Sequence, residues 1–163
     1  MNSVKPVAVL DTDVASYVMK GVPIAWEYLT LLHGYQPGIA FITAAELRFG
    51  AERRDWGTRR RLRLDLFLQE CLILPHEEGM ARVYANVMAN RERVGRRLEK
   101  ADGWIATTAI YHKVPLVTHD SDFVGTPGLR IITASTEARA AQLRLPVVGQ
   151  RPLNLDMRCQ CGL

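Results

Sequence analysis

Five short apolar runs recur along the chain, and longer segments with helical periodicity separate them. The runs are VAVL (7–10), GIAFI (38–42), CLIL (71–74), PLVT (115–118) and LRIIT (129–133), all of strand length and strand composition. Parallel strands need crossover connections, which are usually helices, and these helices cover both faces of the sheet. The alternation therefore predicts an α/β fold, a three-layer α/β/α sandwich with a central parallel sheet.

The segments between the runs predict helices over residues 14–20, 24–33, 44–54, 58–70, 77–98 and 103–112. ASTEARAAQL (134–143) is typical of a closing helix. Beyond it, LPVVGQRPLNLDMRCQCGL has two prolines, two glycines and no clear period. We therefore expect one domain over residues 1–145 and a tail over residues 146–163 that is ordered only if it packs on a partner.

Length and composition are those of one globular domain, with 163 residues, 48% hydrophobic and 23% charged. The apolar runs fall far short of the roughly 20 residues that a membrane span needs, and MNSVKPV lacks the apolar core of a signal peptide. We expect a cytoplasmic protein without a membrane partner. Three cysteines and four scattered histidines argue against a disulfide framework and a zinc site, and Cys71 is expected in the core.

Acidic residues follow three of the predicted strands. Asp11 and Asp13 follow the first strand, Glu46 follows the second by one helical turn, Asp120 and Asp122 follow PLVT, and Asp102 opens the helix before PLVT. Ligands of open α/β sheets bind outside the carboxyl ends of the strands, where these acids converge. Carboxylates about 4 Å apart repel by roughly 1 to 4 kcal/mol per pair, and a hard cation, Mg²⁺ or Mn²⁺, removes that conflict. The pattern indicates phosphodiester or phosphomonoester chemistry.

Most of these acids also suit a purely structural role. Asp13 is favoured as a helix N-cap, Thr43 and Glu46 match the capping box S/T-x-x-E, and Asp102 suits a cap. One of the two aspartates in THDSDF suits turn chemistry. Asp11 has the weakest structural explanation, because it directly follows a strand expected to be buried.

Four motifs in order resemble those of the PIN-domain ribonucleases, and in particular the VapC toxins of bacterial toxin–antitoxin pairs. They are LDTDVAS, TAAELRFGA, ADGWIATTAIYHKVPLVT and THDSDF followed by GLRII, and they cover about residues 6–133. The resemblance implies an acidic metal-binding and catalytic set of Asp11, Glu46, Asp102 and Asp120, with Asp122 as an auxiliary or alternative fourth acid. Thr12 and Thr118 match the hydroxyl positions beside the site, and Asp13 stands where many relatives have Asn or another small polar residue.

The resemblance further implies a Mg²⁺- or Mn²⁺-dependent endoribonuclease that forms a homodimer and binds a small antitoxin across its acidic groove. Asp120 or Glu46 is the expected proton acceptor for the attacking water, and the number of metals stays open.

The net charge is +4 and the pI about 9.2, and the arginines are clustered. Seven lie between residues 48 and 63, and RERVGRR covers residues 91–97. Each cluster suits either a solvated helix face or RNA binding, since cations beside an acidic site are needed to hold a phosphate backbone. The RNA-binding candidates are Arg48, Arg93, Arg96 and Arg97.

Three alternatives remain. In a haloacid-dehalogenase-type phosphatase, Asp11 would be the nucleophile and Asp13 the acid/base, but Ala15 departs from that pattern and Glu46 and Asp102 would have no role. A receiver-like phosphoacceptor domain expects a lysine late in the chain, whereas the last one here is Lys113. A housekeeping PIN-domain RNA-processing nuclease shares the fold and the acids.

Overall fold

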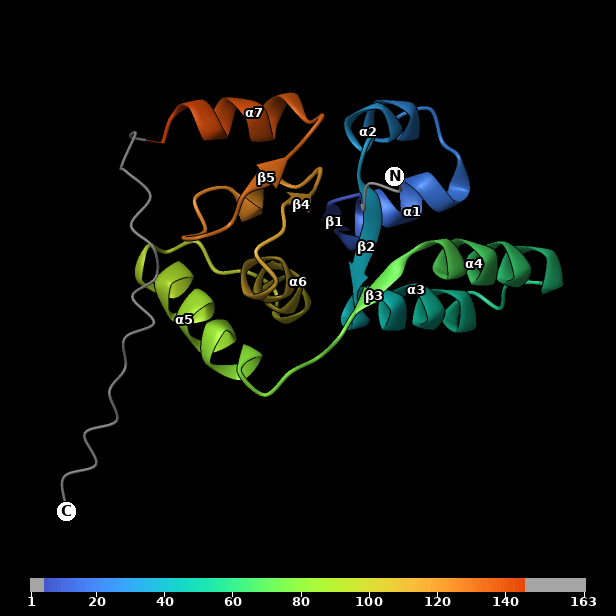
Figure 1. Cartoon of the computed structure of the whole chain (residues 1–163), viewed down its shortest axis with the longest axis horizontal. Helices are drawn as coiled ribbons and strands as arrows, with labels where there is room; N and C mark the ends of the chain where they lie inside the picture. The colour runs from blue at the N-terminus through green and yellow to red at the C-terminus, as the bar shows by residue number, and fades with distance from the viewer. Residues whose placement is uncertain (1–4, 146–163) are drawn as a thin grey trace, which may run out of the picture.

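The computed structural model describes residues 5–145, which form a parallel sheet with helices on both faces (Figure 1). The elements, in chain order, are β1 (Val7–Leu10), α1 (Thr12–Lys20), α2 (Ala25–Leu31), β2 (Gln36–Ala40), α3 (Phe41–Arg53), α4 (Thr58–Glu70), β3 (Leu72–Leu74), α5 (Met80–Arg93), α6 (Lys100–Tyr111), β4 (Leu116–Val117), the 3₁₀ helix η1 (Ser121–Phe123), β5 (Ile131–Ile132) and α7 (Thr136–Leu143). The predicted tail, residues 146–163, lies outside the described residues.

The sheet has the strand order β3-β2-β1-β4-β5, and every pairing is parallel. β1 therefore lies at the centre, with β2 on one side and β4 on the other. Leu10 pairs in register with Ile39 of β2 and Val117 of β4. The residues that follow these three strands consequently emerge at one edge of the sheet, as the sequence pattern predicts.

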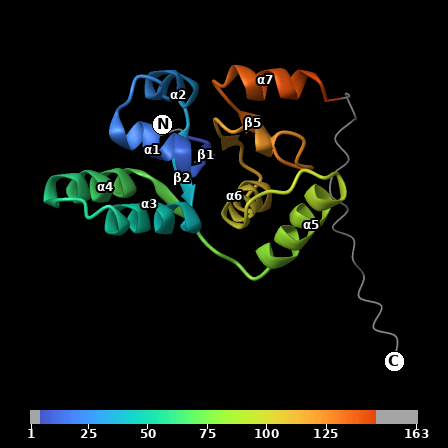
Figure 2. The same cartoon turned by 180° about the vertical axis from the view of Figure 1, so that it is seen from behind.

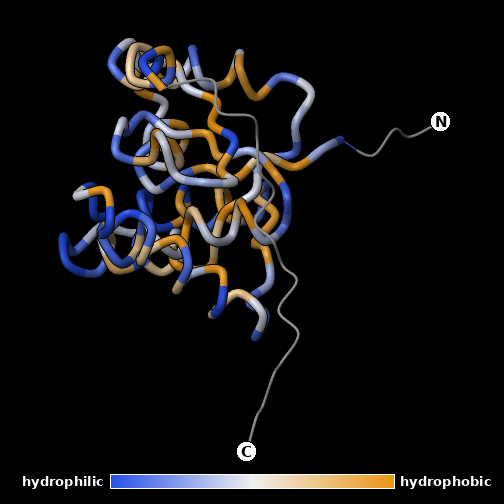
Figure 3. The backbone as a smooth tube through the Cα atoms, turned by 90° about the vertical axis from the view of Figure 1, so that its left-hand side faces the viewer, coloured by the Kyte–Doolittle hydropathy of each residue, from blue (hydrophilic) through white to orange (hydrophobic). Residues whose placement is uncertain are grey.

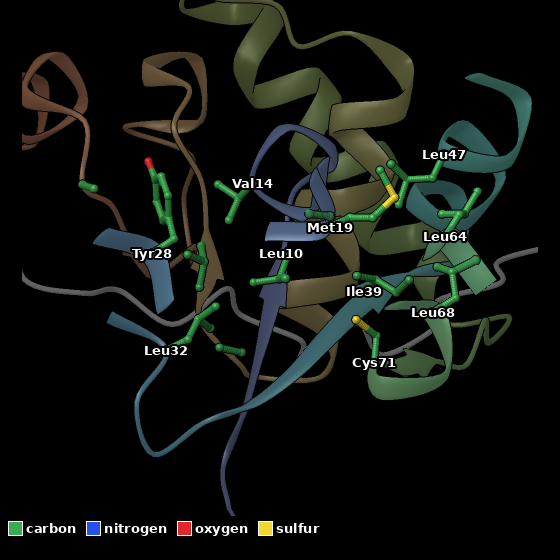
Figure 4. Close-up of a cluster of buried hydrophobic side chains, with 14 of the residues drawn as sticks. Leu10, Val14, Met19, Tyr28, Leu32, Ile39, Leu47, Leu64, Leu68 and Cys71 are labelled. Atoms are coloured by element: carbon green, nitrogen blue, oxygen red, sulfur yellow. The ribbon is translucent and has the colours of Figure 1, made fainter. Parts of the chain in front are cut away.

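Alternate residues of β1 belong to two separate hydrophobic cores, because successive side chains of a strand point to opposite faces. Ala8 and Leu10 pack with α1, α2, α3 and α4, and Figure 4 shows Leu10 among the side chains of that core. Val9 packs against side chains of α5 and α6. The predicted three-layer sandwich is confirmed.

Hydrophobic segments run through the middle of the molecule, and hydrophilic ones lie mostly at its periphery (Figure 3). Cys71 is buried, as expected. Leu72 and Ile73 are about half exposed, because β3 is an edge strand. Within residues 5–145, no helix is long and apolar enough to cross a membrane.

The capping roles suggested by the sequence are wrong at three helices. The N-cap of α1 is Asp11, whose Oδ1 accepts from the Val14 N–H at 2.7 Å, so Asp13 lies inside the first turn. α3 follows β2 without a loop, which places the predicted capping box inside the helix. The N-cap of α6 is Glu99, so Asp102 lies in the first turn. α3 and α6 begin without a side-chain capping bond, so the capping residues that the sequence offers do not set where these two helices start.

Other boundaries also differ from the predictions, and two differences are informative. The apolar run 38–42 ends its strand at Ala40, because its last two residues already belong to α3. The long helix expected over residues 77–98 covers only Met80–Arg93. The closing helix is confirmed as α7, with Ser135 as its N-cap.

Candidate active site

Asp11 is the most buried acid of the site, with 3% of its surface exposed. Because Leu10 pairs with Val117, the next residues, Asp11 and Thr118, lie opposite one another at the strand ends. The Thr118 hydroxyl donates to Oδ2 of Asp11, while the Val14 N–H donates to Oδ1. Both carboxylate oxygens are thus held in place by the fold.

The pKa of the Asp11 carboxyl is raised to about 7, mainly by burial and to a smaller extent by the charge of Asp13. The hydrogen bonds from Thr118 and Val14 act in the opposite direction without offsetting the loss of solvation. A carboxyl group with this pKa is partly protonated near neutral pH.

Glu46 reaches the same edge from the second turn of α3. The Thr12 hydroxyl, at the start of α1, donates to Oε2 of Glu46 at 2.5 Å. This hydrogen bond joins α1, which follows β1, to α3, which follows β2. It therefore fixes Glu46 relative to Asp11, the acid at the end of β1.

Asp102 lies in the first turn of α6 and is partly buried. Its pKa is raised to about 6, first by burial and then by the negative charges of Asp120, Glu46, Glu99 and Asp13. Of these charges, Asp120, Glu46 and Asp13 belong to the acids predicted at the edge, so these three lie close enough to Asp102 to raise its pKa.

The loop after β4 carries Asp120 and Asp122 in different settings. The Asp120 N–H donates to the Thr118 hydroxyl oxygen at 3.0 Å, and Oδ1 of Asp120 accepts from the Asp122 N–H at 2.8 Å. Asp120 is thereby bound to the residue that holds Asp11, and one of its oxygens performs the predicted turn chemistry. Asp122 is exposed, and it is absent from the charges that act on Asp102. The geometry favours Asp120 over Asp122 as the fourth acid.

Arg91 supports this loop from α5, and the sequence analysis did not single it out. Its residue surface is 2% exposed, and its guanidinium donates to the carbonyl oxygens of Asp122 at 2.6 Å and Val124 at 3.1 Å. Arg91 continues the buried series Val83 and Val87 at helical spacing, which is the signal that distinguishes it from its exposed neighbours.

A second support comes from α2. The Tyr28 hydroxyl lies 2.6 Å from Nδ1 of His119 and 3.3 Å from the carbonyl oxygen of Thr118. Tyr17 of α1 packs edge-on against the same imidazole. The peptide that follows β4 is therefore fixed from both α1 and α2.

The predicted RNA-binding arginines lie in varied surroundings. Arg48 pairs with Asp65 of α4 at 2.9 Å, and Arg97 pairs with Glu92. Arg93 donates to Oδ1 of Asn90 at 3.4 Å. Arg96 is exposed. RNA binding by these side chains stays a prediction.

Other cations do lie beside the acids. A hollow of about 310 Å³ is bounded by Thr12, Asp13 and Glu46 on one side. Lys20, Arg53, Arg54 and Trp56 form part of the rest of its wall. The sequence placed the arginines in a dense cluster, but only the packing of α1 against α3 and α4 selects those that border the acidic edge.

The described residues bring the acids together without closing a cage around a point. Within residues 5–145, no group of three or more His, Cys, Asp or Glu side chains lies in a ready metal-binding arrangement. The donor set is composed of carboxylate and hydroxyl oxygens, which suits a hard cation that retains much of its water.

Comparison with known proteins agrees with this fold. The PIN domain profile matches residues 8–129. The VapC ribonuclease Y4jK of Sinorhizobium fredii is 34% identical over 134 residues, which cover 76% of this chain and 94% of the relative. The chain belongs to the PIN domain family.

Solved structures narrow the likeness to the VapC type. The VapBC2 complex of Rickettsia felis, bound to a promoter DNA fragment, contains a chain with a TM-score of 0.70 and 25% identity, which covers 78% of this chain and 98% of that one. A chain of VapBC-5 from Mycobacterium tuberculosis, a member of the VapBC family of toxin–antitoxin systems, has a TM-score of 0.58 and 28% identity to this chain. The match covers 79% of this chain and 100% of that one. The resemblance to VapC-type ribonucleases is confirmed, and with it the expectation of a nuclease.

Proposed function

We propose that this chain is an endoribonuclease that hydrolyses RNA phosphodiester bonds with Mg²⁺ or Mn²⁺, and that it is the toxin of a toxin–antitoxin pair. The observation that carries the proposal is the placement of Asp11, which is buried and held by Thr118 and Val14, and of Asp102 at one sheet edge. The raised pKa of both carboxyl groups supports it. Perturbed carboxyl groups in such a position are typical of functional sites. PIN family membership and VapC-type relatives support the choice of RNA.

The residues at the edge fit a hard divalent cation. Asp11, Asp102 and Asp120 would hold it, with Glu46 beside them and Asp122 further out. A bound cation would lower the pKa of water and stabilise the negative charge that develops on the scissile phosphate. Thr118 keeps Asp11 oriented, and Thr12 does the same for Glu46. Glu46 or Asp120 accepts the proton of the attacking water.

An antitoxin is the proposed protein partner, together with a second copy of the chain. The similar chains of Rickettsia felis and Mycobacterium tuberculosis come from VapBC structures. An apolar groove of about 650 Å³ runs between α2 and α4, and its lining includes Leu29, Leu32, Leu66 and Phe67. Leu29 and Leu66 are about half exposed, which supports docking of an apolar segment there. We propose that the protein acts in the cytoplasm.

Two of the alternatives lose their basis. PIN family membership removes the haloacid-dehalogenase-type phosphatase and the receiver-like domain. In addition, both Asp11 oxygens accept hydrogen bonds, which does not suit a free nucleophile. A housekeeping RNA-processing nuclease shares the fold and acids, so the biological partner must distinguish it from a toxin.

The first experiment is cleavage of a panel of labelled RNAs by the purified chain in Mg²⁺, in Mn²⁺ and in EDTA. We expect cleavage only with metal, and a loss of about a hundredfold or more in both Asp11→Asn and Asp102→Asn. Asp65→Asn, which changes an exposed carboxylate of α4, is the matched control and should cleave normally. Cleavage that persists in EDTA, or that survives both substitutions, contradicts the proposal.

A second experiment distinguishes the toxin from the housekeeping nuclease. Induced expression of the chain should stop bacterial growth, and co-expression of a short neighbouring gene product should restore it. Normal growth with an active, soluble nuclease would indicate the housekeeping role instead.

A further inference from the structure

A continuous groove leads away from the acids along the cationic side of the molecule. It consists of two hollows, the one of about 310 Å³ that borders the acids and a second of about 360 Å³. Both are lined by Lys20, Arg54 and Trp56, so they adjoin one another. The second adds Arg60 and Arg63 of α4. We call the pair the basic channel.

The basic channel lies where the ends of three helices meet. Lys20 is the last residue of α1, Arg53 and Arg54 end α3, and α4 begins at Thr58. Figures 1 and 2 show α3 and α4 side by side, projecting from the sheet on the same side as α1. The basic channel therefore extends outward from the carboxyl edge along the α3–α4 pair.

Ion pairing separates the arginines of this helix pair into two groups. Arg48 pairs with Asp65, and Arg61 pairs with Glu52. Within the part of the chain that the structure describes, no carboxylate lies within ion-pair distance of the five cations of the basic channel, which are Lys20, Arg53, Arg54, Arg60 and Arg63. Five adjacent positive charges without such partners repel one another, and a polyanion relieves that repulsion.

Aromatic side chains accompany these cations. Phe49 is 64% exposed, and the Arg53 guanidinium lies over its ring at 5.9 Å. Trp56 is partly buried and lines both hollows. Cationic grooves that combine backbone contacts with aromatic stacking are typical of single-stranded nucleic acid binding.

We propose that the basic channel binds the phosphate backbone of single-stranded RNA and guides it to the acids, with Phe49 and Trp56 as stacking surfaces. This inference rests on the proposed ribonuclease function and names the substrate path for it. The acids repel phosphates, so an adjoining row of cations is needed to hold the strand where it is cut. An acidic protein segment is the competing occupant. It has less use for the aromatic surfaces of Phe49 and Trp56, and the groove between α2 and α4 offers a protein segment a more apolar lining.

Binding is best measured in the Asp102→Asn background in EDTA, where the RNA is not cut. The probe is a fluorescently labelled single-stranded RNA of about 12 nucleotides, within the usual site size of such grooves. The test variants are Arg53→Gln/Arg54→Gln and Arg60→Gln/Arg63→Gln. Each pair should weaken binding by about tenfold and reduce the slope of log K against log salt by about 1.4, because each lost phosphate contact contributes about 0.7.

The matched control is Arg82→Gln/Arg144→Gln, which removes the same charge from exposed positions on α5 and after α7. It should leave both affinity and salt slope unchanged. Arg53→Lys/Arg54→Lys should keep most of the affinity, since it retains the charge. Thermal unfolding of every variant, which should match the parent within experimental error, separates binding from folding.

Several outcomes overturn the basic channel. If the control pair lowers RNA affinity as much as the channel pairs, the attraction is non-specific. If duplex RNA binds as tightly as the single strand, the single-stranded path is wrong. If the channel pairs leave RNA binding intact but abolish inhibition by the antitoxin, the surface is a protein-docking site. If the wild type cleaves RNA and the channel variants bind RNA as tightly as the parent, the basic channel is contradicted and the proposed function stands. If the wild type shows no metal-dependent cleavage, the proposed function itself is contradicted.

Discussion

The carboxyl edge of the sheet and the α3–α4 helix pair both concentrate charge, but they differ in burial. At the edge, Asp11 and Arg91 are 3% and 2% exposed. On the helix pair, the side chains of Arg48 and Asp65 are 59% and 47% exposed. Buried charges must be held by hydrogen bonds and cost the fold stability, whereas exposed charges cost little and contribute little. The edge is thus suited to chemistry, and the helix pair to recognition.

The largest expected effect concerns the pH dependence of the metal-free edge. Asp11 has a pKa raised from 3.8 to about 7 in the folded chain, so between these values the folded state holds a proton that the unfolded chain releases. Stability therefore falls as pH rises from about 4 to 7, by up to about 4 kcal/mol for this group. Asp102, with its pKa raised to about 6, adds a smaller loss in the same direction. Urea unfolding in EDTA at several pH values measures this fall in the free energy of unfolding.

Asp11→Asn should remove most of that pH dependence, because an amide does not titrate, while Asp65→Asn should retain it. The proposed Mg²⁺ site needs ionised carboxylates, so Mg²⁺ should stabilise the parent more at pH 8 than at pH 5. A variant lacking the Asp11 carboxyl that keeps the full pH slope would show that burial at this edge is not the cause.

The next largest effect is expected for Arg91→Met. The substitution leaves the carbonyl oxygens of Asp122 and Val124 without their donor, and we expect a loss of about 2 to 4 kcal/mol in the free energy of unfolding. Cleavage should also slow, because the loop that carries Asp120 loses its anchor. Arg93→Met, at an exposed position two residues away, is the control and should stay within about 0.5 kcal/mol. Equal unfolding curves for the two variants would rule out an anchoring role.

A smaller effect is expected from Gly103→Ala beside Asp102. An added Cβ would lie 2.5 Å from Sδ of Met88 and 2.9 Å from the ring of Tyr84, where α6 packs closely against α5. The Met88 and Tyr84 side chains must shift to admit it, and we expect a loss of about 1 to 3 kcal/mol. Gly50→Ala, in α3 with open space around it, should be neutral or slightly stabilising. If both variants unfold alike in urea, the close approach of α5 and α6 does not constrain the edge.

The smallest effect belongs to the exposed helix pair. A double-mutant cycle of Arg48→Ala and Asp65→Ala should give a coupling of less than about 1 kcal/mol, since water screens this pair. Urea unfolding measures this coupling. A value of several kcal/mol would contradict the idea that the exposed charges of the helix pair contribute little to stability.

Much of the fold could be predicted from the sequence, because short apolar strands alternate regularly with helical segments. VAVL, with β-branched and aliphatic residues, is the strand β1 at the predicted residues, and the alternation of runs and helices gives the parallel sheet. The sequence singled out Asp11 as the acid with the weakest structural explanation, whereas the folded chain gives it a structural role, because it is the N-cap of α1. The predictions of boundaries and caps were wrong where a strand passes into a helix without a loop, as at Phe41.

The arginines show the limit of that approach. Sequence spacing alone groups Arg48 with Arg53, and Arg91 with Arg93, because each pair lies in one basic cluster. In the folded chain Arg48 pairs with Asp65, Arg53 borders the acids and Arg91 is buried beneath the loop after β4.

The sequence by itself determined the class of fold, the edge at which the acids gather and the kind of chemistry they suit, because strand ends and carboxylates are local features. Only the tertiary structure decided which acid is buried most, which arginine is a structural anchor and which cations border the acids. Solvation and charge pairing depend on neighbours from distant parts of the chain, so the same residue type takes different roles once the helices pack.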